Sequence, residues 1–412
     1  MQDNEKKPAL RFKGFTDPWE QRKLGELVEI GDIDHRMPET VADGIPYLMT
    51  GDFVGTNELN FDGTKMISEE DYCQLSQKIK PEKGDILFAR YASVGAARYV
   101  DFTRKFLISY SCAIIKKSKK INSKYLYHFI TSGKVQQQIK LEINTGSQAN
   151  IGIDSMKNHI VVSMPPLEEQ TKIADALSNL DHLITLHQRK YEKLVNIKKS
   201  MLDKMFPQNG ASVPEIRFKG FTDPWEQRKL SDIVEKVTEK NAGLQYIETF
   251  TNSAEFGIIS QRDFFDHDIS KIGSLDGYYV VHNEDFVYNP RISVTAPVGP
   301  INRNKLGRTG VMSPLYTVFR PHDIDTTYLE HFFKSGYWHS FMNFNGDSGA
   351  RSDRFSIKDS VFFEMPIPTP DIEEQKKIGE FLTQLDTLIT LHQRKLEKLQ
   401  NIKKSCLEKM FV

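Results

Sequence analysis

The sequence has few cysteines, no long apolar run and no net charge. Its three cysteines (Cys73, Cys112 and Cys406) lie far apart and form no Cys-x-x-Cys pair. This spacing argues against a disulfide framework and a zinc site, and favours reduced thiols. No stretch approaches the roughly eighteen apolar residues of a membrane helix, and no apolar segment of a secretory signal follows the charged N-terminus. These absences predict a cytoplasmic protein.

The charge balance is even, with 55 basic and 55 acidic residues. A free-standing DNA-binding protein is usually basic, because phosphate neutralisation supplies much of its affinity. Basic residues are nevertheless concentrated in two segments. Residues 78–120 contain eleven Lys and Arg but three acids, and residues 289–310 contain four basic residues and no acid. Two interpretations stay open for these segments, a DNA-binding surface and an ordinary solvated face.

Catalytic motifs are also lacking. Neither Asn289-Pro290-Arg291 nor Asp17-Pro18-Trp19 matches the Asn/Asp-Pro-Pro-aromatic loop of an adenine methyltransferase, and no glycine-rich nucleotide loop follows a predicted strand. The acids and lysine of 371–376 are too close together for the magnesium site of a nuclease. We therefore predict that the chain catalyses nothing by itself and holds neither a metal nor a cofactor.

What the sequence does contain is a two-fold internal repeat. Residues 11–24 recur letter for letter at 217–230, and residues 181–206 recur at 386–411 with 21 of 26 positions identical. The roughly 140 residues between these blocks resemble each other only faintly. This order predicts one task performed twice by the repeated parts, and one kind of task directed at two targets by the divergent parts.

The second repeated block predicts a long helix in each half. Apolar residues recur at alternating spacings of four and three, which is a heptad pattern. Asp371 is the expected N-cap of the second helix with Glu374 as its capping-box partner, and Pro207 is expected to end the first. Histidine within the seam is expected to form a polar layer that fixes the register. The predicted helix–helix seam consists of Ile173, Leu177, Leu180, Ile184, His187, Tyr191 and Leu194, and of Ile378, Leu382, Leu385, Ile389, His392, Leu396 and Leu399.

The first repeated block predicts a short helix that opens each divergent domain. Asp17 is placed as its N-cap, Pro18 as its first residue and Glu20 as the N3 partner, with the same letters at 223–226. Trp19 and Trp225 are expected to anchor the cores.

The divergent domains predict mixed α and β structure, because short β-branched and aromatic runs alternate with helical stretches. Helices are expected at 121–130 and 325–342. Strands are expected at 45–49, 85–90, 106–115, 159–164, 278–282, 285–289 and 361–366.

Between the two domains, the residues that differ most fall in loops. The strand that begins near Asp85 leads to Arg90-Tyr91 and its counterpart near Asp285 leads to Asn289-Pro290-Arg291, while 146–150 corresponds to 349–354. Arg, Asn and Gln side chains suit the guanine and adenine edges of the major groove, and Lys suits phosphates. Each is also a common surface residue. The candidate DNA contacts are Arg90, Tyr91, Arg98, Lys116, Lys117, Gln148, Asn150, Arg291, Arg303, Lys305, Arg351 and Arg354.

Over essentially its whole length, the chain resembles the specificity subunits of type I restriction-modification systems. The resemblance rests on the two repeated helices, on GDILFARYASVG at 84–95, and on the junctions MPPLEEQTKIADAL at 164–177 and MPIPTPDIEEQKKIGEFL at 365–382. It implies two target-recognition domains that each read half of an asymmetric bipartite DNA site. It also implies antiparallel helices that set the gap and dock two modification subunits. Those subunits would carry S-adenosylmethionine, and further restriction subunits would use ATP and Mg.

The expected fold class is α+β, with two mixed domains in tandem separated by two long helices and related by a pseudo-two-fold repeat. The alternative to DNA reading is a non-catalytic scaffold that bridges two partners. An enzyme that acts alone on DNA is disfavoured by the missing motifs. The expected segments are a tail (1–15), a first target-recognition domain (16–165), a first spacer helix (166–207), a linker (208–220), a second target-recognition domain (221–366) and a second spacer helix (367–412).

Overall fold

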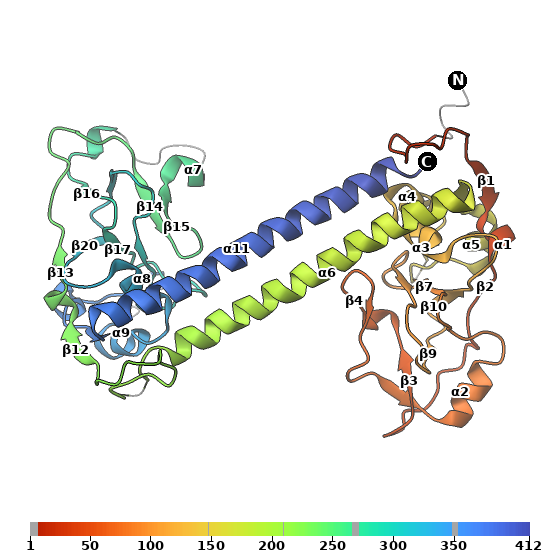
Figure 1. The fold of residues 1–412 in the computed structure, drawn as a ribbon, viewed down its shortest axis with the longest axis horizontal. Helices are drawn as coiled ribbons and strands as arrows, with labels where there is room; N and C mark the ends of the chain where they lie inside the picture. Colours follow the sequence, from red (N-terminus) through yellow and green to blue (C-terminus); the bar gives the residue numbers. More distant parts are fainter. Residues whose placement is uncertain (1–6, 147, 209, 266–271, 348–352) are drawn as a thin grey trace. The chain divides into compact units, whose positions relative to one another are not determined.

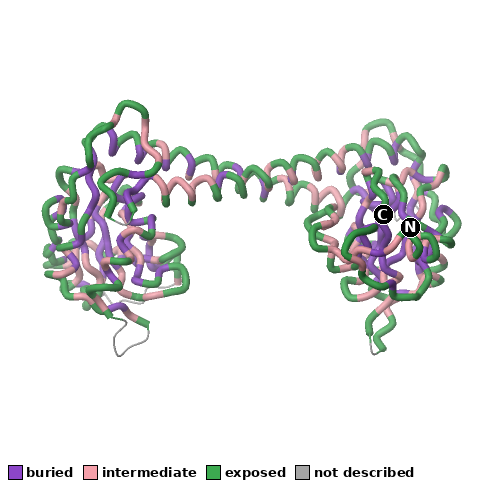
Figure 2. Tube along the Cα trace, turned by 90° about the horizontal axis from the view of Figure 1, so that it is seen from below, coloured by how far each residue is buried: buried purple, intermediate pink, exposed green. Residues whose placement is uncertain are grey.

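The computed structural model describes residues 7–146, 148–208, 210–265, 272–347 and 353–412. It divides into two compact units. The first unit comprises Met1–Arg189 and Gln393–Val412, and the second comprises Lys190–His392. Helices α6 (Leu167–Lys204) and α11 (Ile372–Lys409) each contribute residues to both units. Figure 1 shows the elements of each unit, and Figure 2 shows that buried residues concentrate inside each unit. The expected α+β class is confirmed.

The first unit is built around an antiparallel sheet of order β2-β10-β7-β8 and a three-stranded sheet of order β6-β3-β9. Strands β3 and β9 pair in parallel, and the other pairs are antiparallel. The strands are β1 (Glu20–Lys23), β2 (Ile30–Gly31), β3 (Ile45–Leu48), β4 (Phe53–Val54), β5 (Glu58–Leu59), β6 (Lys65–Ile67), β7 (Ile86–Ala89), β8 (Ala97–Tyr99), β9 (Leu107–Ile108), β10 (Cys112–Ile115) and β11 (Val161–Met164). The helices before α6 are α1 (Leu24–Leu27), the 3-10 turn η2 (Thr50–Asp52), α2 (Glu69–Leu75), α3 (Ser123–Thr131), α4 (Gly133–Leu141) and α5 (Ile153–His159).

The second unit repeats the antiparallel sheet in the order β13-β20-β17-β18, and its described residues also form the two-stranded sheets β12-β21, β14-β15 and β16-β19. Its strands are β12 (Glu226–Lys229), β13 (Val234–Lys236), β14 (Phe250–Ser253), β15 (Gly257–Ser260), β16 (Tyr279–Val281), β17 (Phe286–Tyr288), β18 (Ile301–Arg303), β19 (Gly310–Met312), β20 (Thr317–Pro321) and β21 (Pro366–Thr369). Its helices are η3 (Leu230–Asp232), α7 (Gln261–Phe265), η4 (Ile272–Ser274), α8 (Thr326–Lys334), α9 (His339–Asn345) and α10 (Asp359–Phe362).

The predicted short helix at the start of each domain is wrong. Glu20–Lys23 forms strand β1, which pairs residue for residue with β11, and β12 pairs with β21 in the same way. These pairings satisfy the backbone groups that a helix would have satisfied internally. The prediction for the tryptophans is confirmed, since Trp19 and Trp225 are both buried.

Three other expectations about local structure need correction. Residues 361–366 are not one strand, because α10 ends at Phe362 and β21 begins at Pro366. The helix expected at 325–342 is interrupted after Lys334, where Ser335 is extended and its hydroxyl donates to the Phe332 carbonyl at 2.7 Å. The strand expected at 106–115 is divided into β9 and β10.

The start of α11 confirms one capping residue and corrects the other. Asp371 Oδ1 accepts hydrogen bonds from the amides of Glu373 and Glu374, which confirms it as the N-cap. Glu374 does not complete a capping box. Its buried carboxylate instead accepts hydrogen bonds from Nε and one Nη of Arg217, at 2.7 and 2.8 Å. It also accepts one from the Trp225 indole N–H at 3.1 Å. A charged partner and a tertiary contact therefore outcompete the local cap.

The ends of the long helices complete the core of each unit. Phe206, just after α6, lies in the core of the second unit against Tyr328 and Phe332. Phe411, just after α11, lies in the core of the first unit against Tyr125 and Phe129. All fourteen positions of the expected seam are buried or half-buried.

Candidate nucleic-acid interface

In each unit, the two loops that sequence comparison singles out are joined by the backbone. Tyr91 forms an isolated antiparallel bridge with Asn150, and Arg291 forms the corresponding bridge with Arg354. Hydrogen bonds continue each junction, from the Ile151 amide to the Arg90 carbonyl at 3.1 Å and from the Phe355 amide to the Pro290 carbonyl at 2.7 Å. We call these junctions the paired loops. In each unit, two loops that are far apart in sequence thus lie side by side, joined by a backbone bridge.

The paired loops of the two units carry different side chains. The first unit presents Tyr91 and Asn150, both half-buried, with Gln148 exposed beside them. Asn150 is held by its own loop, because its side-chain amide donates to the Gln148 carbonyl at 3.0 Å. Ala92, the residue after Tyr91, has a left-handed φ of 57°, a conformation that L side chains adopt at a cost. The backbone frame is therefore shared, while the chemistry at its surface differs.

In the second unit, the paired loops border a cleft of about 500 Å³. Arg291, which is exposed, and Arg354, which is half-buried, both line it. The Arg291 guanidinium lies 3.6 Å from the Asp353 carboxylate, and both of these side chains are more than half exposed. An exposed pair of this kind is weak, so Arg291 is available to an external acceptor. The remaining polar lining of the cleft includes Asn289, Ser293 and Tyr316.

Several of the candidate DNA contacts make hydrogen bonds and ion pairs within the fold. Arg90 is only 6% exposed; its guanidinium forms an ion pair with Asp32 and donates to the Ile151 carbonyl at 3.0 Å. Burial would raise the pKa of Asp32, but the His35 hydrogen bond and the Arg90 charge outweigh it and lower that pKa. Arg98 is buried and donates to the carbonyls of Val54, Gly55 and Glu58. Arg90 and Arg98 thus have structural roles, and both guanidinium groups are engaged within the fold.

The lysines of the first unit are engaged in a similar way. Lys116 pairs with Asp85 at 2.6 Å and with Glu82 at 3.0 Å. The exposed Lys117 donates to the Lys83 carbonyl at 3.2 Å. In the second unit, Asp285 corresponds to Asp85. Its carboxylate accepts hydrogen bonds from Nε and one Nη of Arg320, at 2.8 and 3.0 Å. Each aspartate therefore ties together the two central strands of its four-stranded sheet, β7 with β10 and β17 with β20, and Lys116 is engaged by internal acceptors.

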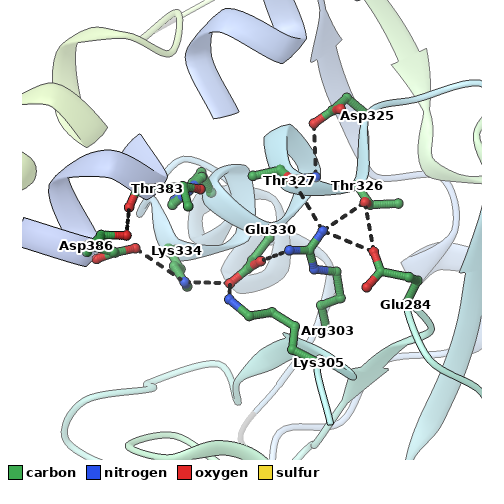
Figure 3. Close-up of polar contacts among 12 residues, drawn as sticks. Glu284, Arg303, Lys305, Asp325, Thr326, Thr327, Glu330, Lys334, Thr383 and Asp386 are labelled. Atoms are coloured by element: carbon green, nitrogen blue, oxygen red, sulfur yellow. Dashed lines mark hydrogen bonds and ion pairs between the residues drawn. The ribbon is translucent and has the colours of Figure 1, made fainter. Parts of the chain in front are cut away.

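Arg303 and Lys305 belong to a polar network that ties β18 to α8. Figure 3 shows Glu330 on α8 between these two side chains, with Lys334 on its other side. Arg303 reaches Glu330 at 2.7 Å and the Thr326 hydroxyl at 2.8 Å, and Lys305 and Lys334 reach Glu330 at 3.0 and 2.7 Å. Both predicted contacts are therefore held by internal acceptors. Arg351 lies outside the described residues.

A second repeated arrangement joins each unit to its long helices, and the sequence analysis missed it. His128 Nε2 lies 3.1 Å from the Ser178 hydroxyl of α6, and His331 Nε2 lies 3.1 Å from the Thr383 hydroxyl of α11. Burial, with nearby lysines, lowers the pKa of each histidine to about 3, so both are neutral near pH 7. The sequence marks these two equivalent histidines by a shared motif, Tyr-Leu-x-His-Phe-x-x-Ser-Gly, which occurs at 125–133 and again at 328–336.

Each histidine lies beside an ion pair between the two long helices. In the first unit, Asp181 of α6 pairs with Lys403 of α11. In the second unit, Asp386 of α11 pairs with Lys198 of α6. Helix α6 supplies the acid of the first pair and the base of the second, and α11 does the reverse. This reversal is what a pseudo-two-fold repeat requires. The helices also expose matching leucines, Leu183 and Leu186 in the first unit and Leu388 and Leu391 in the second.

Within the described residues, no group of three or more His, Cys, Asp or Glu side chains is placed to hold a metal ion. No helix in that part of the chain is both long and apolar enough to cross a membrane.

Comparison with known proteins finds the same architecture. The crystal structure of a type I restriction-modification system S subunit from M. genitalium aligns with a TM-score of 0.58 at 14% identity, covering 98% of this chain and 99% of that one. At this identity the likeness concerns the fold.

Sequence relatives agree over nearly the whole chain. The type I restriction enzyme MjaX specificity subunit of Methanocaldococcus jannaschii is 25% identical over 426 residues, covering 95% of this chain and 92% of its own. The MjaVIII specificity subunit of the same organism is 23% identical, with coverages of 94% and 91%. The protein family described as "Type I restriction modification DNA specificity domain" matches this chain twice, at residues 16–196 and 222–401. The chain therefore belongs to the family of type I restriction-modification DNA specificity subunits.

Proposed function

We propose that each unit reads one half of a bipartite DNA site through its paired loops. The observation that carries this proposal is the repetition of one backbone junction with different side chains, Tyr91 with Asn150 and Arg291 with Arg354. Asn makes bidentate hydrogen bonds to adenine and Arg to guanine in the major groove. A shared frame with different readers is what two unlike half-sites require.

The long helices dock two copies of one modification subunit in this proposal. Leu183 and Leu186 recur as Leu388 and Leu391 in an identical local sequence, and all four are exposed. Because the same apolar residues are exposed on both units, each unit is suited to bind a copy of the same partner. The methyl donor S-adenosylmethionine belongs to those partners, and ATP and Mg belong to restriction subunits. This chain itself catalyses no reaction. Phosphate contacts from partners also account for DNA binding by a chain without net charge.

Methylation mapping tests the reading function. DNA from cells that express this chain with its modification subunit is expected to carry methyladenine at one split motif, and to lose it when this chain is omitted. An unchanged methylation map with verified subunit binding would favour the alternative, a scaffold without DNA readout.

Single-residue variants sharpen that experiment. Arg291→Ala is expected to relax recognition at one half-site, at a cost of about 1–3 kcal/mol for a lost bidentate contact. Asn150→Ala provides the reciprocal control and should affect only the other half-site. If either variant altered both half-sites, the assignment of one unit to each half would be wrong.

Partner docking has its own test. Replacing Leu388 and Leu391 by Asp is expected to reduce the bound modification subunits from two to one, measured by native mass spectrometry. Thr387→Asp combined with Thr390→Asp places the same two charges at exposed positions on another face of α11 and serves as the control. Retention of both subunits by the double variant would contradict the docking proposal.

A further inference from the structure

Two apolar side chains stand almost fully in solvent at the same position of the two units. Leu141 on α4 is 86% exposed, and Phe344 on α9 is 89% exposed. The segments 122–144 and 325–347 align without a gap through the shared Tyr-Leu-x-His-Phe-x-x-Ser-Gly motif. The alignment is also structural, because the Tyr125 and Tyr328 hydroxyls donate to the corresponding carbonyls of Ser163 and Pro368.

Neither side chain contributes to the core. Two positions earlier on the same helices, Ile139 and Met342 are at most 1% exposed and belong to the core clusters of their units. The opposite face of each helix is therefore anchored, which fixes the direction of the exposed side chain. Single exposed apolar residues are common on proteins. A Leu and a Phe at equivalent positions of two otherwise divergent domains call for a shared role.

The position is continuous with the paired loops. Three residues beyond Leu141, Asn144 bridges to Asn150, and three residues beyond Phe344, Asp347 bridges to Ser356. Neither helix carries an acid: 133–141 contains two lysines, of which Lys134 donates to the Phe411 carbonyl, and 339–345 contains no acid and no Lys or Arg. Glu142, the acid nearest to Leu141 in sequence, is paired with His159 at 2.5 Å.

We propose that Leu141 and Phe344 are apolar DNA contacts, each packing against a base step of the half-site that its own unit reads and partly unstacking it. This inference rests on the proposed function. Apolar side chains inserted at base steps unstack and kink duplexes, at a cost of a few kcal/mol per step that added contacts repay. Polar readers in the paired loops would supply discrimination, and the adjacent apolar residue would supply deformation, through which sequence is also read.

The test uses the complex assembled with its modification subunits, on duplexes that carry 2-aminopurine at successive positions of the mapped site. The wild-type complex is expected to raise the fluorescence at one position in each half-site. Phe344→Ala is expected to abolish the increase in the half-site that Arg291→Ala affects and to weaken DNA binding about tenfold. Leu141→Ala should do the same in the other half-site, and Leu141→Phe and Phe344→Leu should retain the signal.

Leu167→Ala removes an exposed leucine at the start of α6 and serves as the matched control, with no expected effect on either readout. Thermal unfolding should be unchanged in both alanine variants. Unaltered fluorescence and binding in both alanine variants, or loss of a modification subunit in either, would overturn this inference while wild-type methylation at a split motif keeps the proposed function. Absence of wild-type methylation at any split motif would instead overturn the proposed function, and this inference with it.

Discussion

At the scale of residues, Glu330 is buried among three basic side chains. Burial alone would raise its pKa, but Lys334, Arg303 and Lys305 outweigh burial and lower that pKa from 4.5 to about 2. The corresponding position in the first unit is Tyr127, which lies 6.2 Å from Tyr99, between ring centroids. The same contact between sheet and helix is thus aromatic in one unit and ionic in the other, which makes only the second unit sensitive to acid at this place.

Glu330→Gln tests this sensitivity. Because the folded-state pKa lies below the ordinary value, the charged carboxylate stabilises the second unit above about pH 4.5, and this contribution is lost as the pH falls toward 2. A shift of this size corresponds to about 3 kcal/mol of unfolding free energy. The variant should therefore be less stable near neutral pH and show a flatter pH dependence between pH 5 and 2, measured by denaturant unfolding. Glu373→Gln, at an exposed ion pair, is the control. A wild-type pH profile in Glu330→Gln would contradict the argument.

The repeated arginine–glutamate pair predicts a larger effect at the start of each domain. Arg11 and Arg217 form paired hydrogen bonds with Glu169 and Glu374, whose side chains are fully buried. Arg217→Ala leaves a buried carboxylate without its ionic partner, so we expect a loss of about 3–5 kcal/mol in unfolding free energy. Lys376→Ala disrupts an exposed pair on the same helix and should cost less than about 1 kcal/mol. Similar losses in the two variants would show that the buried pair has no special weight.

At the scale of elements, the end of α11 acts as part of the first unit. Phe411 is 1% exposed among the aromatic rings of α3, and the Val412 carbonyl accepts from the Ser163 hydroxyl at 3.1 Å. Phe411→Ala should cost about 3–5 kcal/mol, the usual range for emptying a core phenylalanine site. Phe206→Ala should act equally on the second unit. Unfolding followed by hydrogen exchange separates the two effects, and a loss of protection in both units from one variant would argue against this division.

The sequence predicts those elements whose signals are local. Heptad spacing predicts both long helices, and β-branched runs predict strands such as β3, β7 and β17. Sequence-based prediction fails where a strand distant in the chain determines the structure. The segment 17–23 has residues typical of a helix start, but Glu20–Lys23 pairs with a strand about 140 residues later. The internal acceptors of Arg90 and Arg303 could not be foreseen for the same reason, because Asp32 and Glu330 lie far from them in the chain. Loop positions, by contrast, follow from comparing the two halves.

At the scale of the whole molecule, the proposed function divides DNA specificity between two exchangeable parts. Replacing residues 25–163 by the corresponding segment of another family member should change one half-site and leave the other intact. The physical reason is that each unit has its own cores and its own paired loops. Methylation mapping of the chimera gives the result directly. A change in both half-sites would mean that the units do not read independently.

A further prediction of the proposed function concerns the spacing between the half-sites. Helices α6 and α11 are each 38 residues long and each contributes to both units. In the proposed function, a change in their length is expected to change the gap in the DNA site. Inserting one heptad into both helices keeps the seam in register and adds about 10 Å at ~1.5 Å per residue. Since one base pair occupies ~3.4 Å along duplex DNA, the methylated motif should retain both half-sites with a gap longer by about three base pairs. A heptad in one helix only should disturb the seam and is the matched control. An unchanged gap in the doubly extended chain would show that the modification subunits, and not these helices, determine the spacing.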